Sequence, residues 1–326
     1  MALLVGGVAI LAAAMLISSV SPVEAVKTLI LGSLGSRGAI AGTLRETTPL
    51  LIAGVAVYLA LRAGLFNIGV EGQLLVGAAA ATAVALKTSG SAGFMLAAAA
   101  GVGAGALWAL PAGWIRAYRS GHEVITTIML NNVAVYFTGW LLANPMKDPQ
   151  QQSPTTVSID ASTRLPNLYS HPPLIINVAI VVGVTAATLL AIWLKRTIAG
   201  FELEAVGANP RAAQFAGIDP KRTMLLAMTS SGAIAGLAGA VQVLAYEGRF
   251  YAGFSPGYGF DSLGVALLAG NNALGVLPAS LLFGILAKGG TALQIEGVPK
   301  GITTVILGFL ILLAAAIRYR KVNAVA

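Results

Sequence analysis

The chain alternates between long apolar runs and short polar connections over most of its length. A helix needs roughly 20 mainly apolar residues to cross the hydrocarbon layer of a membrane. The pattern therefore predicts an all-α polytopic membrane protein with about ten spans, of which the third and the eighth are short, broken helices. The expected spans lie near residues 1–20, 47–62, 70–87, 92–116, 123–143, 173–194, 223–246, 259–270, 275–292 and 301–318.

Between the second and third spans, glycines and polar side chains interrupt the apolar pattern. Asn67, Glu71 and Gln73 stand in this segment. Irregular polar backbone at membrane depth persists only where it is buried in protein or lines a wet cavity, and an ionisable residue there indicates a functional site. We expect these three side chains to line a substrate pathway. As an alternative, Glu71 holds the fold by pairing with Arg62 or by capping a broken helix.

A second interrupted segment, 254–274, corresponds in position to 64–77 in the first half of the chain. Paired broken segments of this kind point to a transport pathway built from an internal repeat. We place Asp261 in the pathway, with capping of the eighth segment as the alternative. Asn131 and Asn132 lie in an otherwise apolar span, and buried amides need hydrogen-bond partners. They join the predicted pathway, with interhelical hydrogen bonding as their alternative.

Small residues recur along two of the expected spans. Such spacings allow close packing of helices in a membrane. We expect this packing role for Gly101, Gly103, Gly105, Gly232, Gly236 and Gly239.

The connection between the sixth and seventh spans carries the signals of a short helix. Asn209 fits an N-cap and Pro210 the first helical position, Gly217 fits the C-terminal cap, and Pro220 prevents continuation. Isolated helices shorter than roughly 12–15 residues are marginal in water. A helix over 209–217 must therefore pack on something else, and we expect a docking element for a partner protein. A plain connector against the bilayer is the alternative.

Composition narrows the class of function. Charged residues make up 10% of the chain, against about 25% in soluble domains, so residues 1–326 form a single transmembrane domain. There is no cysteine, and the two histidines have no spaced partners, so no metal site is expected. No Gly-Lys pair occurs, which excludes a P-loop. Because no serine has a histidine and a carboxylate at a spacing typical of nucleophilic catalysis, we expect that the chain is not an enzyme.

The formal net charge of +8 is explained by positively charged membrane loops rather than by nucleic-acid binding. An even number of spans puts the densest basic clusters on one side with both termini, and we assign that side to the cytoplasm. The first apolar run is expected to be a retained span rather than a cleaved leader. Two long connections, 21–46 and 144–172, are expected to be solvated outer linkers, with a surface helix in the first as the alternative. The basic clusters assigned to the cytoplasmic side are Arg116 and Arg119; Lys195, Arg196, Arg211, Lys221 and Arg222; and Arg318, Arg320 and Lys321.

Three segments together resemble the integral-membrane permeases of ATP-binding-cassette importers, in the branch that contains ribose, branched-chain amino acid and nucleoside permeases. Residues 64–73 (GLFNIGVEGQ) are most similar to simple-sugar and nucleoside permeases, the guanosine-type uptake systems in particular. Residues 207–218 are similar to the family's coupling loop, and residues 259–272 match a late family segment. The resemblance covers residues 20–315 approximately.

The resemblance implies a second homologous permease, one or two ATP-binding subunits that hold ATP and Mg²⁺, and a lipoprotein that captures a small-molecule substrate outside a bacterial inner membrane. It implies alternating access with nucleosides as the favoured cargo, while a simple sugar or amino acid stays open. A stand-alone secondary transporter or channel is the alternative from another class. The residues that the resemblance assigns to contact with the ATPase are Gly207, Asn209, Pro210, Arg211, Ala212, Ala213, Gly217 and Ile218.

Overall fold

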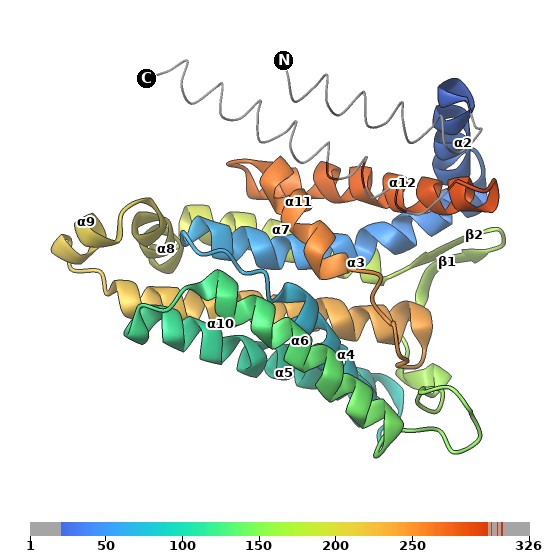
Figure 1. Ribbon diagram of the computed structural model, residues 1–326, viewed down its shortest axis with the longest axis horizontal. Helices are drawn as coiled ribbons and strands as arrows, with labels where there is room; N and C mark the ends of the chain where they lie inside the picture. Colours follow the sequence, from blue (N-terminus) through green and yellow to red (C-terminus); the bar gives the residue numbers. More distant parts are fainter. Residues whose placement is uncertain (1–20, 299–300, 302–304, 306–307, 309–326) are drawn as a thin grey trace.

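The computed structural model describes residues 21–298 together with 301, 305 and 308, and it shows a helical bundle (Figure 1). The expected span 1–20 and most of 301–318 lie outside the described residues. The elements are α2 (Pro22–Leu34), α3 (Arg37–Arg62), α4 (Val70–Ala85), α5 (Gly90–Arg119), α6 (Glu123–Ala143), η1 (Ala161–Thr163), β1 (Asn167–His171), β2 (Leu174–Asn177), α7 (Ala179–Arg196), α8 (Ile198–Ala208), α9 (Pro210–Phe215), α10 (Pro220–Gln242), the π-helical turn η2 (Val243–Glu247), α11 (Tyr258–Ala269), η3 (Ala273–Gly275) and α12 (Val276–Ile295).

Within the described part of the chain, six helices are long and apolar enough to cross a membrane: α3, α5, α6, α7, α10 and α12. The span of α10 includes η2, and the span of α12 includes η3. The apolar helices α4 and α11 are too short to cross, as the interrupted patterns predict. The membrane-embedded, largely helical class is thus confirmed.

Several expected boundaries are wrong. The span expected to begin at residue 47 begins at Arg37, because the Ser36 hydroxyl caps the helix by accepting a hydrogen bond from the Ala39 amide. The stretch 21–46 is therefore helical rather than a linker, since α2 precedes this cap. The span expected from residue 173 begins only at Ala179, because β1 and β2 form a small antiparallel hairpin before it.

Close glycine packing holds the centre of the bundle together. α10 packs most extensively on α5 and α4, and α3 packs on α12 and α11. A Cβ atom placed on Gly105 would meet the carbonyl oxygen of Gly232, and one on Gly236 would meet the carbonyl of Gly101. The predicted packing role is confirmed for these glycines and for Gly239, which abuts the carbonyl of Leu74. It is wrong for Gly103, which has no neighbouring atom within 4 Å of a built Cβ.

The bundle has two distinct ends (Figure 1). Helices α8 and α9 form one end, here the α9 end, and the β-hairpin with η1 forms the opposite one, here the hairpin end. The Lys221 ammonium lies 5.9 Å from the Tyr118 ring, so the last turn of α5 and the first turn of α10 share the α9 end. The basic clusters at 116–119 and 195–222 therefore lie on one side, as their distribution predicts.

The long connection 144–172 is largely irregular, as expected, but it is anchored at the hairpin end. The Thr156 amide donates to the Phe250 carbonyl at 2.9 Å, and the Ile159 amide donates to the Gly248 carbonyl at 2.8 Å. This connection is therefore tied to the segment that links η2 with α11.

Candidate solute pathway and coupling loop

The predicted pathway segment breaks the helical path in the middle of the bundle. α3 ends at Arg62, Gly64 adopts φ +71°, and α4 begins only at Val70. The Asn67 amide nitrogen donates to the Ser231 hydroxyl at 2.9 Å, and that hydroxyl donates to the Ala56 carbonyl at 2.7 Å. Since Ser231 and Ala56 lie well inside α10 and α3, α4 starts in the interior of the bundle.

Asn67 and Gln73 form a paired amide contact across this break. Asn67 Nδ2 donates to Gln73 Oε1 at 2.9 Å, and Gln73 Nε2 donates to Asn67 Oδ1 at 3.1 Å. Asn67 Oδ1 also accepts from the Gly69 amide at 3.0 Å. Both side chains are buried. These hydrogen bonds fix the shape of the segment. We call Asn67, Glu71, Gln73, Asn131 and Ser231 the buried polar core.

The two neighbouring asparagines of α6 have different surroundings. Asn131 is buried; its Nδ2 donates to the Ile68 carbonyl at 2.8 Å and its Oδ1 accepts from the Gly72 amide at 2.9 Å. Asn132 is exposed and donates to the Ile128 carbonyl of its own helix at 3.1 Å. Asn131 thus takes part in interhelical hydrogen bonding, whereas Asn132 lies outside the core.

Glu71 joins the two short helices. Its Oε2 accepts a hydrogen bond of 2.7 Å from the Gly259 amide, in the first turn of α11. A carboxylate is favoured at a helix N-terminus because unpaired amides and the helix dipole attract negative charge. Glu71 therefore caps a broken helix, as its alternative role predicts. Asp261 lies in the first turn of the same helix, whose N-cap position is held by Gly257, and both of its expected roles stay predictions.

Arg62 does not pair with Glu71. Its Nε and Nη2 instead donate to Glu204 Oε1 of α8, at 3.0 and 2.7 Å. Beside this ion pair, a Cβ atom on Gly207 would meet the Arg62 carbonyl, and the Gly64 backbone lies against Gly207. This backbone-to-backbone contact joins α8 to the start of the broken segment. The sequence pattern does not predict α8 as a separate helix.

The predicted coupling helix is present as α9. Asn209 Oδ1 accepts from the Arg211 and Ala212 amides, at 3.0 and 3.1 Å, as an N-cap does. Gly217 closes the helix with φ +85°. Ala213 is its buried side chain, while Phe215 is 94% exposed at its end. Most of the surface of this helix is therefore exposed.

Sequence reasoning missed a second polar group, at the hairpin end. Arg45 Nη2 pairs with Glu247 Oε1 at 2.7 Å, and the Tyr258 hydroxyl donates to Glu46 Oε2 at 2.9 Å. Charges next to apolar runs were the available signal for these residues. We call the whole group the hairpin-end cluster; its members are Arg45, Glu46, Gln242, Tyr246, Glu247, Tyr251 and Tyr258.

The remaining contacts close this cluster around Glu247. Gln242 Nε2 donates to Glu247 Oε1 at 3.1 Å, and the Tyr251 hydroxyl donates to Glu247 Oε2 at 3.2 Å. Burial raises the pKa of the Tyr251 phenol above its ordinary value of 10.0, so the phenol stays protonated and acts as a donor. Tyr246 shares a hydrogen bond of 2.9 Å with Thr48 of α3. The cluster thereby links α3, η2 and α11.

Comparison with known proteins identifies the chain's relatives. The model of the family described as "branched-chain amino acid transport system / permease component" matches residues 39–315. The chain belongs to this permease family. It is 38% identical to the guanosine ABC transporter permease protein NupP of Bacillus subtilis, over 95% of the chain and 90% of that protein. The glucose ABC transporter permease protein TsgB13 of Haloferax volcanii is 36% identical, over 95% of the chain and 83% of that protein.

A third relative is the nucleoside ABC transporter permease protein NupB of Lactococcus lactis, 33% identical over 92% of the chain and 85% of that protein. No solved structure gives a significant match. Family membership makes the chain a membrane-embedded transport subunit rather than an enzyme. It also implies ATP-hydrolysing and substrate-binding partners, as the resemblance of the coupling loop suggested.

Proposed function

We propose that the chain is the permease subunit of an ATP-driven importer for nucleosides that works by alternating access in a bacterial inner membrane. Relatives named for guanosine, nucleoside and glucose transport support this cargo class. The working complex contains a second homologous permease, ATPase subunits with ATP and Mg²⁺, and a substrate-capturing lipoprotein. The full chain has about ten spans in two related halves, with the α9 end and both termini in the cytoplasm.

The exposed α9 helix is the observation that carries this proposal. It is capped at both ends, it leaves Phe215 almost fully exposed, and it follows α8, which is tied to Arg62 and Gly64. A force applied to α9 by a closing ATPase reaches the broken segment through this contact. The residues proposed for the ATPase contact are those of the expected coupling loop, namely Gly207, Asn209, Pro210, Arg211, Ala212, Ala213, Gly217 and Ile218, with Phe215 added.

The two short helices offer a route for the solute. Their N-termini meet at the Glu71–Gly259 hydrogen bond, and half-helix N-termini in transporters commonly flank the binding region. We place Glu71 and Asp261 along this route. Asn67, Gln73 and Asn131 act by holding its shape, and Asn132 faces outward towards the second permease.

The coupling role is tested by Phe215→Ala in the complete transporter. An exposed aromatic side chain is a typical interface anchor, so we expect substrate-stimulated ATP hydrolysis to fall about tenfold or more while the permease stays folded. Phe201→Ala is the matched control, because Phe201 is also an exposed phenylalanine (66%) but lies on α8. Full stimulation in Phe215→Ala would remove α9 from the coupling role.

Cargo is tested separately, by binding assays on the companion lipoprotein with guanosine, glucose and leucine. We expect guanosine to bind most tightly. Preference for glucose or leucine would keep the architecture and change the cargo to a simple sugar or an amino acid.

A further inference from the structure

Two connections meet at the hairpin end and enclose a hollow of about 320 Å³ in its surface. Within the described part of the chain, its lining comes from the 151–155 loop and the 249–252 segment, and not from a membrane-spanning helix. The hollow therefore opens on the aqueous side of the bundle rather than towards lipid tails. We call it the outer hollow; its lining residues are Gln151, Ser153, Pro154, Thr155, Arg249, Tyr251 and Ala252.

Backbone hydrogen bonds hold the two walls of the outer hollow in place. The Ala252 amide donates to the Pro154 carbonyl at 3.1 Å, and Thr155 pairs with Tyr251 in an isolated β-bridge. The Asp148 amide donates to the Thr155 carbonyl at 2.8 Å, which anchors the start of the loop. A surface whose shape is fixed before binding loses less conformational freedom when a partner docks. The outer hollow is thus pre-formed for a contact.

Arg249 gives the outer hollow a positive charge that the chain does not neutralise. The residue is exposed, and it forms no salt bridge within the described chain. The acidic side chains of the facing connection, Asp148 and Asp160, each accept from a backbone amide of their own loop, at 2.9 and 2.7 Å. A second guanidinium, that of Arg164, lies against Gly248, directly before Arg249. This part of the surface therefore attracts a negatively charged group.

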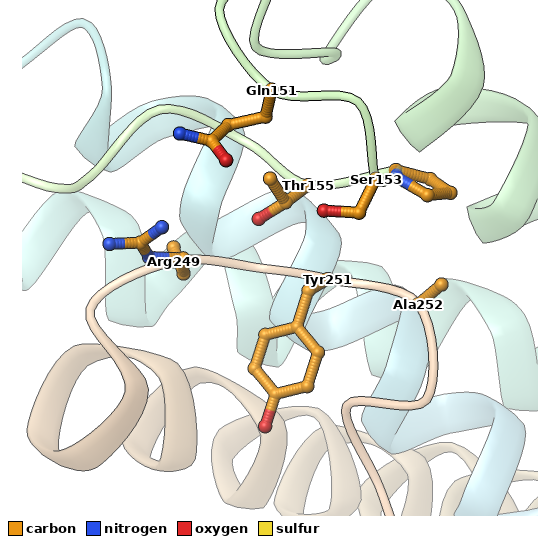
Figure 2. Close-up of a pocket in the computed structure, with 7 residues that line it drawn as sticks. Gln151, Ser153, Thr155, Arg249, Tyr251 and Ala252 are labelled. Atoms are coloured by element: carbon orange, nitrogen blue, oxygen red, sulfur yellow. The ribbon is translucent and has the colours of Figure 1, made fainter.

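Three side chains can donate hydrogen bonds into the outer hollow. Arg249 carries five N–H groups, and Gln151 and Ser153 add an amide and a hydroxyl. Neither Gln151 nor Ser153 has a side-chain hydrogen bond within the described chain, and both are exposed. Figure 2 shows the side chains of Gln151 and Arg249 extending to the same side from the two walls. Arginine commonly pairs with a carboxylate through two parallel hydrogen bonds, so these donors suit an acidic group.

The exposure of the lining favours a protein partner over the transported solute. Thr155 is buried, whereas Gln151, Ser153, Arg249 and Ala252 are exposed. Small-molecule sites bury about 70–90% of the surface of their ligand, and an exposed lining does not achieve this. A side chain that projects from a docked protein is instead covered by the protein that carries it.

We propose that the outer hollow is the point on this chain where an acidic side chain of the substrate-capturing lipoprotein docks. This inference rests on the proposed function, which puts the α9 end in the cytoplasm and the lipoprotein on the opposite side. The carboxylate pairs with Arg249 and accepts further hydrogen bonds from Gln151 and Ser153. The 249–252 segment leads into α11, whose Gly259 amide bonds to Glu71. The docked lipoprotein therefore contacts the chain next to the proposed solute route.

Binding of the companion lipoprotein to the complete transporter in lipid nanodiscs tests this docking point. We expect Arg249→Gln to weaken binding about tenfold at low salt, because a charge-assisted contact is lost. Arg249→Glu should weaken it further through like-charge repulsion. Raising the salt concentration should narrow the difference between wild type and Arg249→Gln, because salt screens exposed charges. Arg37→Gln is the matched control, since Arg37 is another exposed arginine at the hairpin end and does not line the hollow.

Ala252→Trp tests the shape of the site without changing its charge. A large side chain at this exposed lining position should fill the hollow and weaken lipoprotein binding as well. Size-exclusion chromatography reports whether each variant complex assembles. If the Arg249 variants do not assemble, Ala252→Trp decides, and wild-type affinity in that variant would overturn the docking point.

Three other results would also overturn it. These are wild-type affinity in an assembled Arg249→Glu transporter, equal weakening in Arg37→Gln and Arg249→Gln, and loss of bound phospholipid from Arg249→Gln with lipoprotein affinity unchanged. The last result would assign this arginine to the membrane surface. All three leave the importer function intact. A wild-type transporter that binds no lipoprotein would instead contradict the proposed function.

Discussion

The buried polar core and the hairpin-end cluster both place polar side chains inside an apolar bundle, but they differ in how completely these are satisfied. In the core, the amides of Asn67, Gln73 and Asn131 are fully buried and engaged with each other or with the broken backbone. In the cluster, the side chain of Arg45 is 46% exposed and that of Glu247 is 16% exposed, and the buried Gln242 Oε1 has no hydrogen-bond partner among the described residues. Polar side chains in this bundle therefore differ in burial and in how completely their hydrogen bonds are made, and the two regions should respond differently to the loss of a side chain.

Asn67→Leu should have the largest effect on stability. The asparagine makes four hydrogen bonds, and leucine would leave the Gly69 amide and the Gln73 side chain without these partners. At about 1–3 kcal/mol for each buried unsatisfied group, the loss should be roughly 4 kcal/mol. Thermal unfolding of the purified permease complex in detergent measures it. A loss no greater than that of Gln242→Leu would erase the distinction between the two regions.

Asn131→Leu and Asn132→Leu sharpen the comparison with two adjacent asparagines. Removing Asn131 leaves the Ile68 carbonyl and the Gly72 amide unpaired, for a loss of about 3 kcal/mol. Asn132 bonds only within its own helix, so its replacement should change stability by less than about 0.5 kcal/mol. The same unfolding measurement compares both variants. Equal losses would show that burial does not separate these two amides.

Gly207→Val tests the connection between the core and the α9 end. A side chain at Gly207 would collide with the Arg62 carbonyl and separate α8 from the broken segment. Forcing atoms into a close-packed contact costs about 1–3 kcal/mol. We expect a moderate loss of stability with a severe loss of substrate-stimulated ATP hydrolysis, measured on the same preparation. Gly103→Val is the control, because a Cβ there has open space; equal loss of stimulation in both variants would contradict the coupling route.

Glu71→Gln should have the smallest effect of the series. Glutamine keeps an oxygen that can accept from the Gly259 amide, so the cap on α11 survives. The change removes the favourable charge at the helix N-terminus, at about 0.3–1 kcal/mol, and places an amide beside Ser255, whose side chain also bonds to the Glu71 carboxylate. Thermal unfolding should give this variant a free energy of unfolding within about 1 kcal/mol of the wild-type value. The free energy of unfolding of Glu71→Leu should be clearly lower. A Glu71→Gln variant as unstable as Glu71→Leu would show that the carboxylate has another essential partner.

The helical class, the two short helices and the capped α9 helix were all predictable from the sequence, because each depends on local signals. Apolar run length gave the spans, and Asn209, Pro210 and Gly217 carry cap preferences that act within one turn. The boundary at Arg37 was missed because residues 37–46 carry charged side chains among apolar ones and were assigned to an outer linker. Here Arg45 and Glu46 continue the helix and pair with Glu247 and Tyr258.

The polar contacts depend on tertiary structure and could be predicted only as residue types. The segment 64–73 was correctly singled out, but the exchange of hydrogen bonds between Asn67 and Gln73 requires their relative placement. Asn131 and Asn132 look alike in sequence, and only the rotation of α6 within the bundle separates them. The partner of Arg62, Glu204, lies far along the chain on a helix that has no distinct sequence signal.

Solute uptake into reconstituted vesicles tests most directly whether transport through this permease is driven by an ATPase that contacts the α9 end. Vesicles would contain the chain with its second permease, its ATPase and its lipoprotein, and labelled guanosine or glucose would be offered from the lipoprotein side. We predict uptake that requires ATP and stops when the ATPase subunit is omitted. Uptake of either solute by the chain alone, driven by an ion gradient, would contradict the account.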